Sequence, residues 1–157
     1  MTDFIVENVD TSASVNTDTG FEYLDHPADV ILHGWGKTWN ETLSKCIEGL
    51  ANYMIPFDNV ETTDKIEIHL DNIDDDNDAA SLILDEYLFK FTTELFIAKK
   101  VQCNHSGHTI DCICYGETFK IGKHHQGTEV KAITCHNLQV YRKSDGEKSH
   151  VFIMLDI

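Results

Sequence analysis

Two stretches of the chain carry apolar residues at the spacing of one helix face. The first contains Trp39, Leu43, Ile47, Leu50 and Met54. The second runs from about residue 79 to 96 and contains Ile83, Leu84, Tyr87, Leu88 and Phe91. Recurrence every three or four positions predicts an amphipathic α-helix in each. Thr38 and Glu41 form a capping box at the start of the first helix, and Pro56 marks its end.

Shorter apolar or alternating segments predict β-strands. They are Phe21–Leu24, Val30–Trp35, Ile66–Leu70, residues 99–104, Thr109–Cys114, Glu129–Tyr141 and Ser149–Asp156. Asp145-Gly146 is a tight-turn signal between the last two. Because the strands gather at the C-terminal end instead of alternating with helices, we expect an α+β fold. In it, two helices pack on a largely antiparallel (mixed) β-sheet within a single compact domain.

Composition narrows the class of protein. The chain has 157 residues, enough for one domain, and its first 20 are polar without a period. We therefore expect a disordered tail over residues 1–20 and the domain over 21–157. The formal net charge of −15, from 27 acidic and 12 basic residues, argues against autonomous nucleic-acid binding. Any RNA would be held by a partner.

The location of the protein is predicted from what the chain lacks. No apolar run reaches the roughly 20 residues of a membrane span, and no apolar N-terminal signal is expected. Five cysteines are an odd number without a secreted framework, so a reducing compartment, cytoplasmic or nuclear, is favoured.

The chain contains cysteines and histidines that could ligate zinc, but their spacing argues against a zinc site. Cys112 and Cys114 would share one strand face, with Cys135-His136 and His124-His125 available to complete the ligand set. No C-x-x-C pair is present, and strand spacing suits a tetrahedral site poorly. The pattern favours small core residues instead. Nothing marks a low-pKa thiolate of a Cys–His hydrolase either.

The acidic residues suggest a hard-cation site. Asp29 follows a turn and leads into a strand, and Asp156 follows an apolar run that should hold the C-terminus in place. Asp156 and the α-carboxyl of Ile157 put two carboxylates almost side by side. If Asp29 lies beside them, the oxygen ligands suit a calcium- or magnesium-like ion. Asp25 and Asp29 are equally consistent with simple turn formation.

Other polar segments are compatible with ordinary surface roles. The acidic run Asp71–Asp78 lacks the glycine and closing glutamate of a calcium loop, and is interpreted as a solvated lead into a helix N-terminus. The loop Gly122–Gly127 can cradle an anion or be plain surface. Glu129, Lys131 and Ile133 are expected on one strand face, where the first two would form a charged pair.

Several motifs together resemble the archease family. They are Asp25-His26-Pro27-Ala28-Asp29, Leu84-Asp85-Glu86-Tyr87-Leu88, Gly116-Glu117, the run from His125 to Thr134, and the terminal Asp156-Ile157. Tyr87 replaces the tryptophan usual in the family. Pro27 stands where the family more often has threonine, which removes a backbone donor and a hydroxyl. The resemblance covers residues 21–157.

The resemblance implies an accessory protein rather than an enzyme. Archeases stimulate the RtcB-type RNA ligase, which joins 2′,3′-cyclic-phosphate or 3′-phosphate RNA ends to 5′-hydroxyl ends. They promote its guanylylation and multiple turnover in tRNA splicing and RNA repair. The family's metal ligands correspond to Asp29, Asp156 and the Ile157 carboxylate. The resemblance also suggests that His26, Glu117, Glu129 and Lys131 are partner-contact or functional residues.

Two functions from other classes remain open. A metal-dependent phosphoesterase would use the same acids, although the sequence shows no evident nucleophile and no basic clamp for a substrate phosphate. A chaperone-like binding module would protect unrelated clients and would not need Asp156.

Overall fold

The structure, a computed structural model, describes residues 17–26 and 28–157. Its elements are β1 (Gly20–His26), β2 (Asp29–Gly36), α2 (Trp39–Met54), β3 (Asp64–Leu70), α3 (Asp76–Glu94), β4 (Phe96–Ser106), β5 (Thr109–Thr118), β6 (Ala132–Tyr141) and β7 (Ser149–Asp156). The predicted order of helices and strands is confirmed. The expected tail, residues 1–20, falls mainly on residues 1–16, which lie outside the described residues, and Gly20 belongs to β1.

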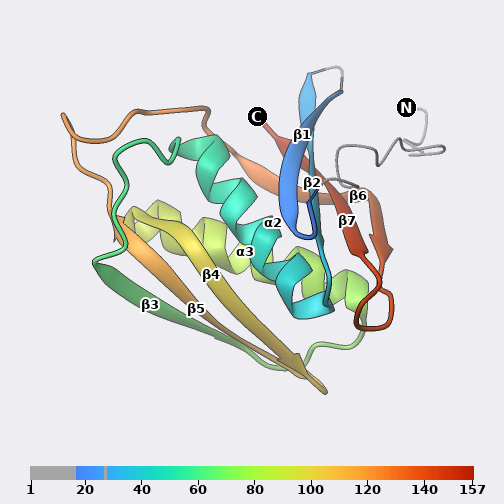
Figure 1. The fold of residues 1–157 in the computed structure, drawn as a ribbon. Helices are drawn as coiled ribbons and strands as arrows, with labels where there is room; N and C mark the ends of the chain where they lie inside the picture. The colour runs from blue at the N-terminus through green and yellow to red at the C-terminus, as the bar shows by residue number, and fades with distance from the viewer. Residues whose placement is uncertain (1–16, 27) are drawn as a thin grey trace.

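The α+β class is confirmed, and the structure adds that the described strands divide into two sheets. Strands β1-β2-β7-β6 form the first and β3-β5-β4 the second, with every neighbouring pair antiparallel. Both helices lie between the sheets (Figure 1). In α2, 11 of 16 residues are buried, so this helix needs cover on more than one side.

The hydrophobic core surrounds the two helices. Leu32 of β2 and Ile153 of β7 belong to it from the first sheet, and Val101 and Ile110 from the second. α2 approaches β2 closely at Gly49, where a Cβ atom would lie 2.6 Å from Cδ1 of Leu32. A side chain at this position would force the side chains of Leu32 and Phe21 to move.

α2 begins where the sequence predicts a cap, whereas α3 begins at Asp76, three residues before its expected start at about residue 79. At α2, Thr38 Oγ1 accepts a hydrogen bond from the Glu41 amide at 3.1 Å. Glu41 Oε2 reaches back to the amide of Lys37, at 3.0 Å, one residue earlier than in a standard capping box. At α3, Asp75 accepts from the Asp78 amide at 2.7 Å. The acidic run is therefore a helix N-terminus, as its pattern indicated.

Polar side chains of α2 accept hydrogen bonds from backbone amides of β4, one of the two edge strands of the second sheet. β4 is an edge strand, and three of its amides donate to side chains four residues apart on α2. The pairs are His105 N to Asn40 Oδ1 at 2.9 Å, Cys103 N to Ser44 Oγ at 2.9 Å, and Val101 N to Glu48 Oε2 at 3.1 Å. Four helical residues advance about 6 Å and two strand residues about 6.7 Å, so the two repeats stay in step.

β6 begins later than the sequence pattern predicted. It starts at Ala132 rather than Glu129, because the segment before it is held by the end of α2: the amides of Gly127 and Thr128 donate to the carbonyls of Met54 and Tyr53. The first contact with β7 is the bond from Lys131 N to Asp156 O, at 2.7 Å. The expected shared face is also wrong: Ile133 is buried, whereas Glu129 and Lys131 are exposed. Only a strand starting at Glu129 would have kept the three residues in one alternation.

Candidate metal centre and adjoining groove

Residues from four strands meet at one end of the first sheet. Across neighbouring strands, His26 of β1 lies opposite Asp29, Asp29 opposite Asp156 of β7, and Asp156 opposite Ala132 of β6. We call these four residues the terminal row. Directly opposite residues project to the same face, with Cβ atoms about 5 Å apart. The structure therefore brings Asp29 and Asp156 together, as the hypothesis of a shared acidic site requires.

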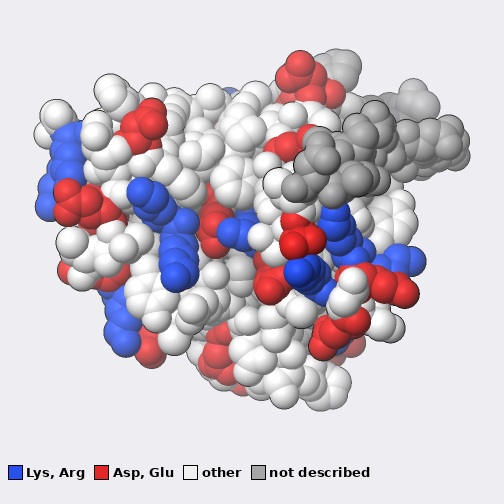
Figure 2. Space-filling view, viewed as in Figure 1, with Lys and Arg blue, Asp and Glu red and all other residues white. Residues whose placement is uncertain are grey.

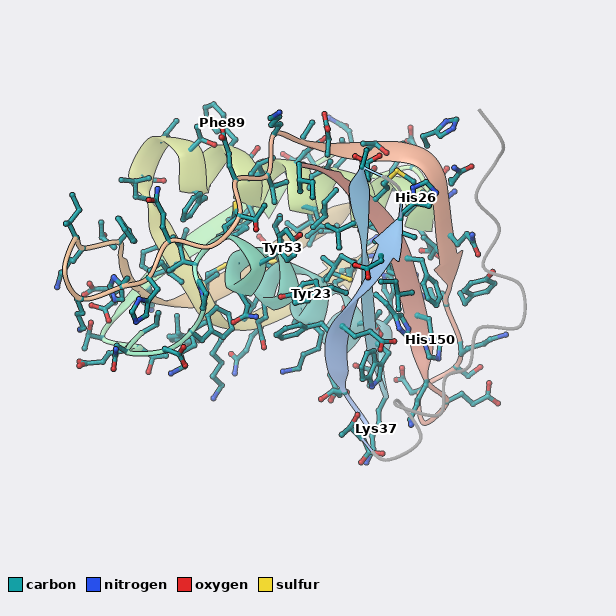
Figure 3. The ribbon with its side chains drawn as sticks, turned by 90° about the horizontal axis from the view of Figure 1, so that it is seen from above. Tyr23, His26, Lys37, Tyr53, Phe89 and His150 are labelled. Atoms are coloured by element: carbon teal, nitrogen blue, oxygen red, sulfur yellow. The ribbon has the colours of Figure 1, made fainter. Side chains whose placement is uncertain are left out.

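The terminal row sits on a firmly held part of the sheet. Val151–Leu155, which precede Asp156, are all buried, and Ile157 packs against the core. Ala28, just before Asp29, has a positive φ of 66°, an uncommon backbone conformation for a residue with a side chain. Figure 3 shows His26 and Lys37 at opposite ends of the β1–β2 pair.

The donor set of the terminal row is made of carboxylate oxygens. Asp29 and Asp156 are both partly buried, and such oxygens suit calcium or magnesium better than zinc. Among the described residues, no group of three His, Cys, Asp or Glu is arranged to hold a metal ion. A metal at this position would need a further oxygen ligand, for which the Ile157 α-carboxylate, one residue beyond Asp156, is the nearest along the chain. Asp25 is exposed and lies opposite Val30, outside the row.

The cysteines of the zinc hypothesis lie mostly in the core. Cys112 and Cys114 are buried there, together with Cys46 and Cys103, while Cys135 is exposed. Burial raises the pKa of the Cys114 thiol to about 12. The interpretation of Cys112 and Cys114 as small core residues is confirmed.

Glu117 lies in a separate buried cluster. Its Oε2 accepts from the Glu61 amide at 2.6 Å and lies 2.9 Å from Lys123 Nζ and 3.2 Å from His124 Nε2. The bond from the Glu61 amide, helped by Lys123 and His124, lowers the pKa of Glu117 to about 2. Glu117 thus fixes the loop between β5 and β6, since Lys123 and His124 of that loop turn inward onto it.

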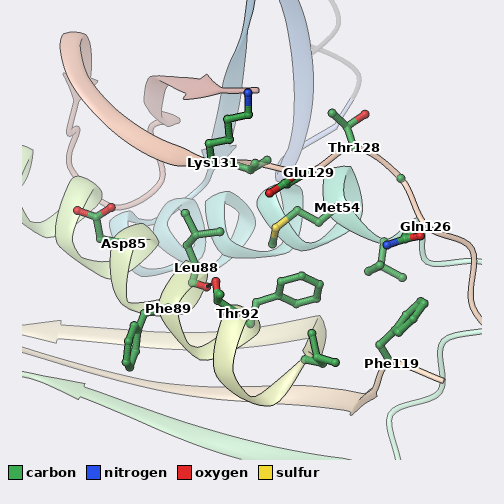
Figure 4. A pocket seen from close by; sticks show the side chains of 15 residues that line it. Met54, Asp85, Leu88, Phe89, Thr92, Phe119, Gln126, Thr128, Glu129 and Lys131 are labelled. Atoms are coloured by element: carbon green, nitrogen blue, oxygen red, sulfur yellow. Dashed lines mark hydrogen bonds between the residues drawn. The ribbon is translucent and has the colours of Figure 1, made fainter. Parts of the chain in front are cut away.

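Glu129 and Lys131 line an open groove beside the terminal row. The groove has a volume of about 710 Å³ and lies between α3 and the segment Gln126–Lys131 (Figure 4). We call it the α3 groove. Its apolar lining consists of Met54, Ile55, Leu88, Phe89, Phe91, Leu95, Phe119 and Val130. Sequence reasoning missed this feature, although Phe89, which lies off the predicted apolar face of α3, was a signal for it.

In the first sheet, a row of three hydrogen-bonded polar side chains, Glu22, His33 and His150, was also missed by sequence reasoning. His33 is fully buried, and its ring stacks on that of Phe152. Its Nδ1 lies 2.6 Å from Glu22 Oε2 and its Nε2 lies 2.9 Å from His150 Nδ1. Burial lowers the pKa of both histidines, that of His150 to about 4.

The visible surface carries no single basic patch. On the face in Figure 2, lysine and arginine side chains are interspersed with aspartate and glutamate. This distribution offers no continuous cationic track for a nucleic-acid backbone on that face. Among the described residues, no helix is long and apolar enough to cross a membrane.

The fold and the terminal row define a small α+β protein in which two antiparallel sheets enclose a helix pair and carry acidic residues at the end of one sheet. The model of the Archease protein family (MTH1598/TM1083) matches residues 21–157. The chain therefore belongs to the archease family, and the resemblance found in its sequence motifs is confirmed.

Individual relatives agree over most of the chain. "Protein archease-like" of Drosophila melanogaster is 40% identical over 146 residues, covering 87% of this chain and 90% of the relative. "Protein archease" of Ictalurus punctatus is 41% identical over 144 residues, covering 87% and 85%. The solution structure of Methanobacterium thermoautotrophicum protein 1598 is 26% identical with a TM-score of 0.73, covering 88% of this chain and 99% of that one.

Proposed function

We propose that this protein is a non-catalytic activator of an RtcB-type RNA ligase. It promotes guanylylation and multiple turnover of the ligase in tRNA splicing and RNA repair, in the cytoplasm, the nucleus or both. Membership of the archease family over residues 21–157 supports the proposal. The observation that carries it is the pairing of Asp29 with Asp156 at the sheet end, because it brings side by side two of the metal ligands that the family resemblance implies.

The terminal row holds a divalent, calcium- or magnesium-like ion in this proposal. Asp29, Asp156 and the Ile157 α-carboxylate are its protein ligands. Bound there, the ion would supply positive charge that neutralises phosphate charge developing during GTP attack. The protein's own contribution is to hold like-charged oxygens together on a rigid sheet, which a bound cation then stabilises.

The surface around the row makes the contact with the ligase. His26, Glu129 and Lys131 lie in the row or in the adjoining segment, so one partner surface can meet all three. A net charge of −15 favours a basic partner surface such as a phosphate-binding groove, and makes the association sensitive to salt. RNA is then contacted only through the ligase. Stimulation requires that the protein bind one ligase state better than another or that it position the ion.

The test is multiple-turnover ligation by purified ligase, with GTP and RNA ends of the required chemistry, in the presence of Asp29→Asn or Asp156→Asn. We expect both variants to lose most of the stimulation, because the ligands lose charge while keeping their size. Isothermal titration with Ca²⁺ or Mg²⁺ should show affinity lowered by about tenfold or more. The matched control is Asp58→Asn, an exposed acid in the loop after α2.

The outcomes separate the parts of the proposal. Full stimulation by both row variants would contradict the metal site. Unchanged ligation with the native protein would contradict the activator role. Turnover of a phosphate ester by the native protein without any ligase would instead favour a hydrolase.

A further inference from the structure

α3 carries apolar side chains on the side that faces away from the core. Ile83, Leu84 and Tyr87 are fully buried, as expected for the inner face. Leu82 and Phe89, seven residues apart and so on the same side of the helix, are 41% and 61% exposed. A large aromatic side chain this exposed next to other apolar side chains is typical of an interaction surface.

The α3 groove is held open by a fixed second wall. In the segment opposite α3, Gly127 N donates to Met54 O at 2.8 Å and Thr128 N to Tyr53 O at 3.1 Å. At Gly127 a Cβ atom would lie 2.5 Å from Tyr53 O, so the close approach depends on glycine. Because backbone bonds hold this wall to the end of α2, the groove does not need to form on binding.

The shape of the groove favours a chain segment over an enclosed small molecule. Phe89 stands on its rim with more than half of its surface exposed, and Figure 4 shows its ring on the outer side of α3. Leu82 continues the apolar stripe one heptad towards the start of the helix. An amphipathic helix laid along such a stripe contacts it through residues three, four and seven apart.

The charged side chains on the rim of the α3 groove determine which kind of partner segment fits it. Asp85 and Glu129 contribute two carboxylates and Lys131 one ammonium group, which leaves the rim acidic. A second copy of this chain would bring its own formal charge of −15 to the interface, and the two copies would repel. A segment with lysine or arginine beside its apolar side chains fits the rim better.

The groove also adjoins the terminal row. Lys131 lines the groove, and its amide donates to the carbonyl of Asp156. A partner segment that fills the groove would therefore end next to Asp29 and Asp156. Docking in the groove and action at the row are thus parts of one continuous surface.

We infer that the α3 groove is the docking site for an apolar, lysine- or arginine-bearing segment of the enzyme that this protein activates. The inference rests on the proposed function, because it takes that enzyme to be the RNA ligase. In this inference, the groove provides affinity for the ligase, and the terminal row stimulates the activity of the ligase.

The experiment measures the dissociation constant of the protein–ligase complex for Phe89→Asp, Glu129→Arg and Asp156→Asn. We expect Phe89→Asp to weaken binding by about 10- to 30-fold, as for loss of an aromatic anchor. Glu129→Arg should weaken it too, with a flatter salt dependence. Asp156→Asn should bind within about twofold of native protein while failing to stimulate.

Ile121→Asp is the matched control, because Ile121 is 95% exposed at a loop tip and does not line the groove. It should bind and stimulate like the native protein. Melting temperatures of all variants confirm folding, and Phe89→Ser serves if Phe89→Asp fails to fold.

Three results would overturn the inference. The first is native affinity of folded Phe89 variants. The second is equal weakening by Ile121→Asp, which would show a general effect of added charge. The third is dimerisation of the native protein in sedimentation that Phe89→Asp abolishes, which would assign the groove to a second copy. The proposed function fails independently of these, if native protein binds the ligase without stimulating it.

Discussion

At the scale of single residues, the partly buried, hydrogen-bonded row Glu22–His33–His150 makes stability depend on pH. Glu22 only accepts, so neutral His33 carries its proton on Nδ1 and accepts from His150 through Nε2. Glu22 faces His33, and Lys143 and Lys148 lie near His150; these lysines add to burial in keeping the pKa of His150 low.

The sign of the effect follows from these lowered pKa values. Below the ordinary histidine pKa of 6.5, the unfolded chain binds protons that the folded protein binds only near pH 4. We therefore expect the melting temperature to be flat from pH 8 to 7 and to fall as pH drops from about 6.5 to 4. His150→Gln should flatten this fall in thermal unfolding monitored by circular dichroism. Glu117, with its pKa of about 2, loses its contribution only at lower pH, below its ordinary value of 4.5.

A pH profile of His150→Gln that matches the native one would contradict this assignment. His69→Gln is the matched control: His69 is exposed and its pKa is raised by Asp111 and Asp71. Its protonated form is therefore favoured by folding, and its loss should not flatten the fall.

Tyr87 combines an apolar ring and a hydrogen-bonding hydroxyl at one buried position. Tyr87 stands where the family's motif carries tryptophan, and it is fully buried. Its hydroxyl donates to Phe96 O at 2.8 Å and accepts from Ala98 N at 3.1 Å. The aromatic body fills the core while the polar end ties α3 to the start of β4, so the substitution leaves no unpaired hydroxyl.

At the scale of elements, the hydrogen bonds between α2 and the edge strand β4 are expected to stabilise the fold, and mutation can test this. In Ser44→Ala the Cys103 amide loses its acceptor in a buried place. We expect a loss of about 1–3 kcal/mol in the free energy of unfolding, the cost of an unsatisfied buried donor. Urea titration measures this loss, and hydrogen exchange at Cys103 should become faster.

The control for Ser44→Ala is Thr93→Ala. The Ser44 and Thr93 hydroxyls each donate to the carbonyl four residues earlier in their helix, Asn40 O and Phe89 O. Thr93, however, is on the exposed side of α3 and, within the described part of the chain, accepts from no buried amide of a strand in the way Ser44 does. We expect a change within about 0.5 kcal/mol there. If Ser44→Ala is no more destabilising than Thr93→Ala, the edge of β4 does not depend on α2.

Element prediction succeeded where the signals were local. The apolar repeat from Trp39 to Met54 and the cap at Thr38 are contained in one stretch of chain, and both were predicted correctly. The start of β6 was predicted wrongly because the preceding segment bonds to α2, far back along the chain: the amides of Gly127 and Thr128 donate to Met54 O and Tyr53 O. The polar stripe of Asn40, Ser44 and Glu48 would have read as a solvated helix face, since its acceptors serve a strand about 60 residues away.

At the scale of the whole molecule, the proposed ligand set, which includes the Ile157 α-carboxylate, can be tested by extending the chain. A Gly-Ser-Gly extension after Ile157 would convert this α-carboxylate into a peptide carbonyl and so remove one charged ligand of the proposed site. We expect Ca²⁺ or Mg²⁺ affinity, measured by calorimetry, to fall by about tenfold, as for loss of one charged ligand. Stimulation of the ligase should fall with it.

The same extension placed before Met1 is the matched control and should leave metal affinity unchanged. Native affinity with the C-terminal extension would remove Ile157 from the ligand set and leave Asp29 and Asp156 to be judged by their own variants. Unchanged melting temperature in both extended proteins would show that the effect is local to the terminal row.

The sequence by itself determined the features that depend on neighbours in the chain. These are the two helices and their caps, the strand segments, the α+β class and the family motifs around Asp29 and Asp156, because helical and strand periods are local properties of the backbone. The tertiary structure alone decided which residues meet: the register that aligns His26, Asp29 and Asp156, the separation of Glu117 from them, and the α3 groove. Register and groove follow from how distant segments pack together, and a one-residue slip in pairing would turn Asp29 to the other face of the sheet.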